Sequence, residues 1–529
     1  MDFVKENLLT ILILLPVIGA VATIGHVMFW KEEGKLKLIT LGFTLVSFVL
    51  SLLLILDPGK PSESGFLFEQ NVPWISAINA NYHIGVDGLS LWLVILTTFI
   101  MPIAVLSTWN AVEKRVTAFY VFLQLLQSAM IGVFVSLDLL VFYLFFEASL
   151  IPMFFLIGIW GGENRIYSAV KFFIYTALGS LLMLVAIIAL FFLHKEATGT
   201  GSFDYVTIMN SMALGNLVID TGVAAILFFA FALAFSIKVP LFPLHTWLPD
   251  AHTDAPTAGS VILAAVLLKM GTYGLLRFAF NFFPEATREY AYIFIILSVI
   301  GIVYGALVAM VQPDIKRLVA YSSVSHMGFV MLGMFSFTEI GMQGAVYQML
   351  NHGISTGALF LLVGFIYERR HTRKIEDFGG IASVMPLYTA IFVITAMSSI
   401  GLPLLNGFVG EFMIMVGMWT STAVSYPWVT TMIAGTGVIF AAVYLLWMIQ
   451  RVFFGKLSNE KNQGLKDLSW RELGIIAPLV FLMVFMGVYP KPFLDKTRDS
   501  VVAIQERVIG KPKAPEAPAM TTKSAETVR

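Results

Sequence analysis

The chain has 529 residues, of which 58% are hydrophobic and only 12% are charged, and its formal net charge is zero. A soluble chain of this length would carry about a quarter charged residues, so the composition excludes an ordinary soluble domain and gives no sign of nucleic-acid binding. The chain has no cysteine, which excludes disulfides and thiolate-ligated iron–sulfur or zinc sites.

Apolar runs of about 20 residues follow one another along the chain and predict an all-α polytopic membrane protein with about fourteen transmembrane helices. The first run, LLTILILLPVIGAVATIGHVMF, lacks a basic leader. We therefore expect a retained span, with a cleaved signal as the alternative. The predicted spans are 8–29, 37–56, 89–108, 117–136, 138–159, 168–193, 222–248, 256–280, 290–311, 318–336, 343–367, 384–419, 428–452 and 472–490.

Two of these spans are expected to be broken helices. The seventh contains Pro240 and Pro243, and proline removes a helical hydrogen bond. The twelfth is too long for one regular crossing and contains GLPLLNGFVGEF, in which Gly401 and Pro403 predict a break.

The basic residues predict the orientation of the spans. Up to residue 490, the connections after even-numbered spans contain only Lys60, Lys195, Arg277 and Arg288, and the connections after odd-numbered spans contain many more. The positive-inside rule then places the odd-numbered connections in the cytoplasm and both termini outside.

An internal repeat organises the middle of the chain. Similar blocks start at residues 138 and 314, 168 and 344, and 258 and 434, and each pair lies 176 positions apart. Five spans in each copy force the second copy to enter from the opposite side, which predicts two inverted five-helix repeats. The expected units are 1–116 (spans 1–3), 117–280 (first repeat), 281–455 (second repeat), 456–490 (span 14) and 491–529 (a polar tail without fixed structure).

Ionisable residues inside the spans are the candidate functional residues, because each costs about 2.5–3.5 kcal/mol at mid-membrane and such groups mark ion or proton pathways. They are Glu147, Lys238, Lys269, His326, His352 and Glu411, with Lys171 near the start of its span.

Each candidate also has a structural explanation. Lys171 could extend its ammonium to the membrane surface, the histidines could be neutral hydrogen-bonding groups, and the other charges could form static salt bridges. The segment HTWLPDAHTD could bind a metal, but we expect Asp254 to cap span 8 ahead of Pro256 and Asp250 to lie in the turn.

Lys238 lies where the prolines open the seventh span, so water and polar groups can gather there. Burial favours the neutral lysine, and a carboxylate such as Glu147 favours the charged one. At about 4 Å and an effective dielectric near 20, engaging one carboxylate is worth roughly 4 kcal/mol. That exceeds the roughly 2.3 kcal/mol for moving a charge against 100 mV. We therefore expect Glu147 to approach Lys238 closely.

Two segments, KVPLFPLHTWLPDAHTDAPTAGSVILAAVLLKMGTYGLLRF and FFEASLIPMFFLIGIWG, resemble the antiporter-like subunits of respiratory complex I, and the second is most similar to the subunit M branch. The resemblance implies that Glu147, Lys238, Lys269, His326, His352 and Glu411 carry protons along two joined half-channels. Glu411 stands where subunits L and N usually have lysine.

The resemblance further implies a proton-pumping subunit of NADH-quinone oxidoreductase in the bacterial cytoplasmic membrane, beside subunits L and N. No cofactor is expected on this chain; FMN, iron–sulfur clusters and quinone are expected in other subunits. The alternatives are a subunit of a cation/proton antiporter without redox activity and a non-transporting scaffold with permanently paired charges.

Overall fold

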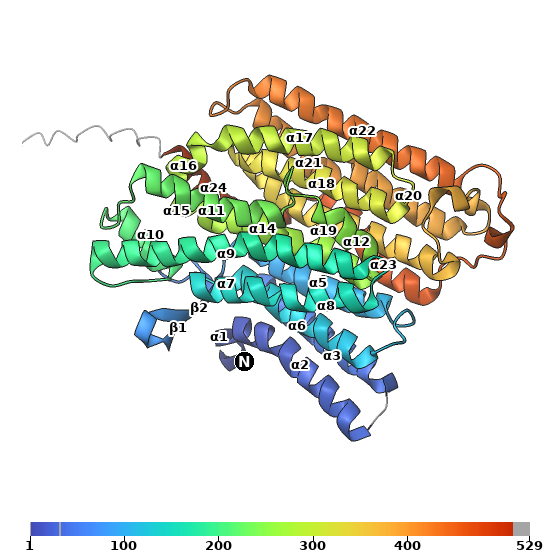
Figure 1. Ribbon diagram of the computed structural model, residues 1–529, viewed down its shortest axis with the longest axis horizontal. Coiled ribbons are helices and arrows are strands. Elements are labelled where there is room, and N and C mark those ends of the chain that lie inside the picture. Colours follow the sequence, from blue (N-terminus) through green and yellow to red (C-terminus); the bar gives the residue numbers. More distant parts are fainter. Residues whose placement is uncertain (1, 31–32, 511–529) are drawn as a thin grey trace, which may run out of the picture.

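The computed structural model describes residues 2–30 and 33–510, and it is predominantly helical (Figure 1). The helices of the first half are α1 Asp2–Glu6, α2 Leu8–Trp30, α3 Glu33–Ser51, α4 Leu53–Leu56, α5 Leu91–Ser107, α6 Val116–Val135, α7 Leu139–Ala148, α8 Leu150–Trp160, α9 Arg165–Thr198, α10 Tyr205–Ala213, α11 Thr221–Lys238 and α12 Trp247–Asp254. Those of the second half are α13 Thr257–Ile262, α14 Leu268–Gly274, α15 Phe280–Phe282, α16 Pro284–Glu289, α17 Ala291–Met310, α18 Ile315–Met334, α19 Glu339–Arg370, α20 Pro386–Ile400, α21 Asn406–Trp419, α22 Pro427–Phe453, α23 Trp470–Val488 and α24 Lys491–Ile509.

Within the described residues, eleven helices are long and apolar enough to cross a bilayer. The predicted spans around α5 and α20 contain shorter apolar helices, and α18 is not among the eleven. The polytopic helical fold is therefore confirmed, and the count of fourteen spans stays a prediction.

Both predicted helix breaks are present. α11 ends at Lys238, and the chain turns before α12 begins at Trp247. α20 ends at Ile400, where Gly401 adopts a left-handed conformation with φ +85°, and α21 begins at Asn406. Both breaks follow from local chemistry, because proline or a left-handed glycine interrupts the hydrogen-bond series of a helix.

Two helical segments form the enclosed centre of the molecule. The continuous stretch Thr257–Phe282 and the apolar part of α19 are fully buried, whereas about a third or less of α3 and α23 is buried. Small residues allow this close packing. A Cβ on Gly271 would lie 2.6 Å from the carbonyl oxygen of Phe235, so glycine lets α14 lie directly against α11. The enclosed segments can therefore carry polar groups away from lipid.

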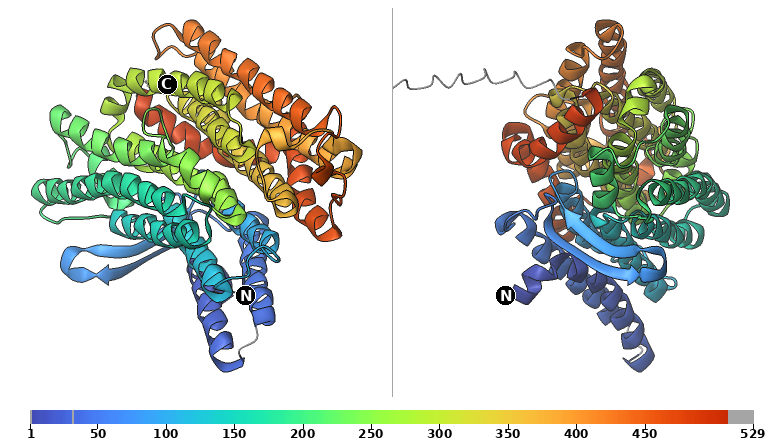
Figure 2. Two further views of the ribbon diagram at one scale, coloured as in Figure 1. Left: turned by 45° about the vertical axis from the view of Figure 1, so that its right-hand side comes forward. Right: turned by 90° about the vertical axis from the view of Figure 1, so that its left-hand side faces the viewer.

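A β-hairpin stands out from the helices, and the apolar runs of the sequence do not predict it. β1, Leu67–Ile75, pairs antiparallel with β2, Ala80–Val86. Asn79 takes a left-handed conformation at the turn and donates a 2.9 Å hydrogen bond to the carbonyl oxygen of Gly201. The hairpin thus lies at the same end of the molecule as the loop between α9 and α10 (Figure 2).

The prediction of a tail without fixed structure is wrong for its first part, because Lys491–Ile509 form α24. Phe493, Val501 and Ile504 are buried, and intervening positions are charged and exposed. This amphipathic periodicity stabilises the helix against the bundle. The Pro/Ala-rich part, 511–529, lies outside the described residues.

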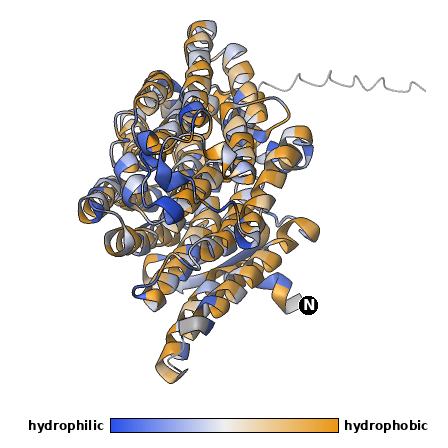
Figure 3. Cartoon of the chain, turned by 90° about the vertical axis from the view of Figure 1, so that its right-hand side faces the viewer, coloured by the Kyte–Doolittle hydropathy of each residue, from blue (hydrophilic) through white to orange (hydrophobic). Residues whose placement is uncertain are grey.

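Hydrophilic segments gather at the end of the molecule that faces the viewer in Figure 3, opposite the hairpin. Three ion pairs link helices and connections that are distant in the sequence. They are Lys171–Asp250 at 2.7 Å, Arg369–Glu472 at 2.6 Å and Arg373–Asp314 at 3.1 Å. Arg369 and Arg373 belong to the basic connections after odd-numbered predicted spans.

Candidate functional site

The six candidate residues come from six different helices. They are Glu147 on α7, Lys238 at the end of α11, Lys269 on α14, His326 on α18, His352 on α19 and Glu411 on α21. All of them except the half-buried Glu147 are buried. The geometry around each residue shows which of them the fold brings together.

Lys238 lies at the first break. Pro240 has no N–H to bond the Ser236 carbonyl, and that oxygen instead accepts from the N–H of Leu241 at 2.8 Å. The indole N–H of Trp247 donates to the Ile237 carbonyl at 2.9 Å. The freed carbonyls are thus satisfied locally, and the ammonium of Lys238 has no hydrogen-bond partner among the described residues.

Aromatic rings surround the Lys238 ammonium. Its nitrogen lies 5.0 Å from the ring centre of Phe146 and 5.6 Å from that of Phe172. Such cation–π contacts offset part of the cost of burying a positive charge. The rings accept no conventional hydrogen bond from the ammonium. No such bond therefore holds its proton in place, and Lys238 can exchange that proton with another group.

The close approach expected between Glu147 and Lys238, in a salt bridge or across one water molecule, stays a prediction. No ion pair joins them in the described structure, and Oε1 of Glu147 is buried without a hydrogen-bond partner. The roughly 4 kcal/mol expected for a pair at about 4 Å is therefore not realised in this conformation; a side-chain movement or a bridging water would be needed to engage the pair.

Lys269 lies directly after a π-helical turn, Leu263–Leu267, in the enclosed central stretch. Its ammonium hydrogen-bonds to the carbonyl oxygen of Ala264 within that turn and lies 2.7 Å from Nδ1 of His352. π-Helical turns occur often at functional sites, because they expose backbone groups that a regular helix would use. The turn thus supplies one of the two acceptors of a fully buried lysine.

His326 and Glu411 form the second polar pair. Nδ1 of His326 lies 2.8 Å from Oε1 of Glu411, and its Nε2 lies 3.2 Å from the hydroxyl of Ser399. The same Glu411 oxygen accepts from the side-chain amide of Gln348 at 3.0 Å. Each ring nitrogen of His326 therefore faces a group with which it can exchange a proton.

The Lys269–His352 pair and the His326–Glu411 pair meet where their two histidines face each other. The rings of His326 and His352 are 6.0 Å apart, centre to centre, and Nε2 of His352 has no hydrogen-bond partner among the described residues. The fold therefore arranges Lys269, His352, His326 and Glu411 in a buried row with one gap between the imidazoles. A water molecule or a ring rotation would close that gap.

Two expectations about the segment HTWLPDAHTD are wrong. Asp254 does not cap the following helix; its carboxylate accepts from the hydroxyl of Ser168 at 2.5 Å. Asp250 does not lie in the turn but in α12, where it pairs with Lys171. Both carboxylates are thus occupied by α9, and the described residues contain no group of three or more His, Asp or Glu side chains that could hold a metal ion.

Sequence reasoning missed several polar neighbours of the row. Gln348, Asn351 and Ser399 are neutral side chains, which a search for charges does not detect. His252 lies in the segment HTWLPDAHTD, for which the sequence suggests metal binding as a role. It stacks on Phe360 with ring centres 4.6 Å apart, and both of its ring nitrogens lack hydrogen-bond partners among the described residues.

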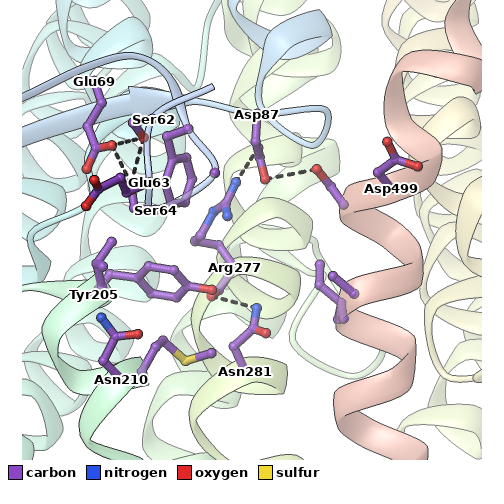
Figure 4. Close-up of a pocket in the computed structure, with 17 residues that line it drawn as sticks. Ser62, Glu63, Ser64, Glu69, Asp87, Tyr205, Asn210, Arg277, Asn281 and Asp499 are labelled. Carbon is purple, nitrogen blue, oxygen red and sulfur yellow. Dashed lines mark hydrogen bonds and ion pairs between the residues drawn. The ribbon is translucent and has the colours of Figure 1, made fainter. Parts of the chain in front are cut away.

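A separate cavity of about 970 Å³ opens at the hairpin end and contains none of the six candidates (Figure 4). Buried Arg277 forms an ion pair there with Asp87, and Asp87 accepts from the hydroxyl of Ser500 on α24 at 3.1 Å. Acidic Glu63, Glu69 and Asp499 also line it. These contacts join the central stretch Thr257–Phe282, the hairpin end and α24. The cavity therefore lies where three parts of the fold meet, and it is separate from the buried row.

The family model of the NADH:quinone oxidoreductase/Mrp antiporter transmembrane region matches residues 136–440. NADH-quinone oxidoreductase subunit M of Rhodobacter capsulatus is 46% identical over 507 residues, which cover 94% of this chain and 96% of the relative. Subunit M of Escherichia coli K12 is 42% identical over 511 residues and covers 93% and 98%, respectively.

Two solved structures share the fold. A chain of respiratory complex I from Thermus thermophilus with bound NADH superposes with a TM-score of 0.83 at 30% identity, over 94% of this chain and 99% of that one. A chain of the membrane-bound sulfane sulfur reductase, an archaeal respiratory complex, has a TM-score of 0.79 at 21% identity over 95% and 99%. The second likeness concerns the fold alone.

Proposed function

The chain belongs to the NADH:quinone oxidoreductase/Mrp antiporter family of membrane subunits, and from this membership we propose how it carries protons. It is a proton-translocating membrane subunit of NADH-quinone oxidoreductase, respiratory complex I. The redox steps belong to other subunits of the complex. We propose that FMN, the iron–sulfur clusters and quinone are bound there, in agreement with a chain that has no cysteine.

The proposed topology has fourteen spans, which are the eleven long apolar helices together with α5, α18 and the broken pair α20–α21. Spans 4–8 (117–280) and 9–13 (281–455) form the two inverted repeats, with spans 1–3 (1–116) before them and span 14 (456–490) after them. The paired breaks after Lys238 and Ile400 support this division. The basic connections face the cytoplasm, and both termini face the outer side.

The proposed proton path starts at Glu147 and Lys238 and continues through Lys269, His352 and His326 to Glu411. The single observation that carries it is the buried row in which Lys269 contacts His352 at 2.7 Å and His326 contacts Glu411 at 2.8 Å. Protons enter from the cytoplasm on the Lys238 side and leave to the outside from Glu411. Each transfer breaks an N–H or O–H bond on one group and forms one on the next.

The proposed neighbours are the antiporter-like subunits L and N. Glutamate at position 411, where those subunits usually carry lysine, supports a place for this chain as subunit M.

We expect Lys238→Ala to lower proton pumping and coupled NADH–quinone activity together, because it removes the titratable group at the first break. NADH oxidation by an artificial electron acceptor should not change, since that chemistry is remote. The matched control is Lys60→Ala, which removes an exposed lysine. Wild-type pumping in a fully assembled Lys238→Ala complex would refute a role for Lys238.

The second candidate function is cation/proton antiport without redox chemistry, which the family description also includes. Copurification of the chain with flavin-containing subunits and NADH oxidation by the purified complex would exclude it. A scaffold with permanently paired charges is disfavoured by the Lys238 ammonium, which has no ion-pair partner among the described residues.

A further inference from the structure

The carboxylate of Glu411 has two differently placed oxygens. Oε1 accepts from Gln348 and contacts His326, as described above. Oε2 faces the break between α20 and α21, because a Cβ built on Gly401 would lie 3.3 Å from it. One oxygen is therefore turned toward the histidines and the other toward the helix break.

The Gln348 amide is itself held by a second amide. Nδ2 of Asn351 donates to Oε1 of Gln348 at 2.9 Å and to the backbone carbonyl of Asn406 at 2.8 Å. Because the Gln348 oxygen receives this donor, its NH₂ group must face Glu411. Both amides are buried, so neither can exchange these bonds for bulk water.

The far end of this series of hydrogen bonds lies at the break. Asn406 is the first residue of α21, and its side-chain oxygen accepts from the hydroxyl of Ser398 on α20. Gly410 makes room for the amides: a Cβ there would lie only 2.3 Å from Oε1 of Gln348. The series therefore runs from the start of α21, through α19, and back to Glu411 one turn further along α21.

We propose that Gln348 is a positioning residue that, through Asn351, couples the geometry of the α20–α21 break to the orientation of the Glu411 carboxylate. The proposal rests on the proposed role of Glu411 as the last proton carrier. With the series intact, Oε1 stays beside His326. A shift at the start of α21 moves the Asn406 carbonyl, releases Asn351 and Gln348, and lets the carboxylate turn toward the break.

The amide suits this role because it donates a hydrogen bond without competing for the proton. When Glu411 is loaded, an N–H bond of the His326 imidazolium breaks and an O–H bond forms on the carboxylate, which leaves a neutral imidazole. When Glu411 unloads, that O–H bond breaks and water on the break side takes the proton, which restores the carboxylate. Gln348 is unchanged in both steps and decides only where the carboxylate points.

The test uses the complete complex reconstituted in vesicles. Gln348→Leu keeps a similar volume and removes the donor, so we expect the rate of pumping per NADH oxidised to fall about tenfold, the effect of losing one hydrogen bond to a charged group. Redox-induced infrared difference spectra add a local readout. The carboxyl band that Glu411→Gln abolishes should be shifted in Gln348→Leu.

The matched control is Gln343→Leu on the same helix, a buried glutamine outside this series, which should leave both the band and the pumping unchanged. If Gln348→Leu does not assemble, Asn351→Ser tests the same coupling and should shift the same band. An unshifted band with normal pumping in an assembled Gln348→Leu or Asn351→Ser complex would overturn the proposal. If Glu411→Gln also pumps normally, the proposed function itself fails; if Glu411→Gln does not pump, only the positioning role fails.

Discussion

Lys269 shows how a fully buried lysine can be both held and able to react. An uncompensated charge in the membrane interior costs several kcal/mol, and here the Ala264 carbonyl and the His352 imidazole both accept from the ammonium. The carbonyl cannot take the proton, but the imidazole can. The pair can therefore pass one proton from nitrogen to nitrogen while the surroundings stay in place.

Lys269→Arg separates the charge of this residue from its ability to release a proton. A guanidinium keeps the positive charge but does not deprotonate in proteins, so we expect pumping and coupled NADH–quinone activity to fall nearly as far as in Lys269→Ala. The measurement is vesicle acidification per NADH oxidised. Lys195→Arg, at an exposed site, is the matched control. Normal pumping by Lys269→Arg would show that the site needs only a charge.

The charged members of the row could be predicted because a charge inside an apolar run is conspicuous. Its neutral members could not: Gln348 and Asn351 resemble many other polar residues of buried helices, and their role depends on contacts with another helix. The sequence does not reveal that the Ala264 carbonyl can accept a hydrogen bond from Lys269, because only a π-helical turn makes that oxygen available.

At the scale of elements, one histidine connects the two strands of the hairpin and links them to the segment before α10. His83 on β2 lies between two carboxylates, 2.6 Å from Oε1 of Glu69 on β1 and in contact with Asp204 before α10. Burial lowers the pKa of His83, but the two carboxylates outweigh it, and the net pKa is raised above its usual value. The pKa values of Glu69 and Asp204 are net lowered, because bonds to His83 and nearby hydroxyls outweigh burial.

These shifts predict a pH window for the stability of the hairpin. The contribution of His83 is fully present below its unfolded pKa of about 6.5 and is lost as pH rises through the raised folded value. The contributions of the carboxylates are present above about pH 4 and are lost as pH falls through their lowered values. The protection of the amides in 67–86 against hydrogen exchange, measured as their rate relative to an unstructured chain at the same pH, should therefore be greatest between these limits.

The variant His83→Leu tests this window. It should lower this protection most at mildly acidic pH and remove the pH dependence of the protection between neutral and mildly alkaline pH. His194→Leu, a buried histidine that bonds a carbonyl and a hydroxyl rather than a carboxylate, is the matched control. A hairpin whose exchange keeps its wild-type pH dependence in His83→Leu would contradict the argument.

Elements were predictable where one physical rule dominates. Length and apolarity located the long helices, and proline and glycine located both breaks. The hairpin was missed because its strands occur in a connection between spans, and its pairing depends on contacts with Gly201 and Asp204 far along the chain. α24 was missed because its composition is polar, although its buried positions recur with helical spacing.

For the whole molecule, the arrangement of polar groups follows from which helices are enclosed. The central stretch Thr257–Phe282 and α19 carry Lys269 and His352, and both are shielded from lipid. Lys238 is on α11, which packs against α14, and Glu411 is on α21, which packs against α19. In the proposed path, a proton passes groups contributed by both halves of the sequence, and the last of them is Glu411.

The most direct test of this account is the number of protons pumped per NADH oxidised by the complete complex with Glu411→Gln, compared with Glu411→Asp. Glutamine keeps the shape of the side chain and its bond to Gln348 but cannot titrate, so we expect severely impaired pumping with unchanged NADH oxidation by an artificial acceptor. Aspartate keeps the carboxylate and should retain part of the pumping. A fully assembled Glu411→Gln complex that pumps at the wild-type ratio would contradict the proposed proton path.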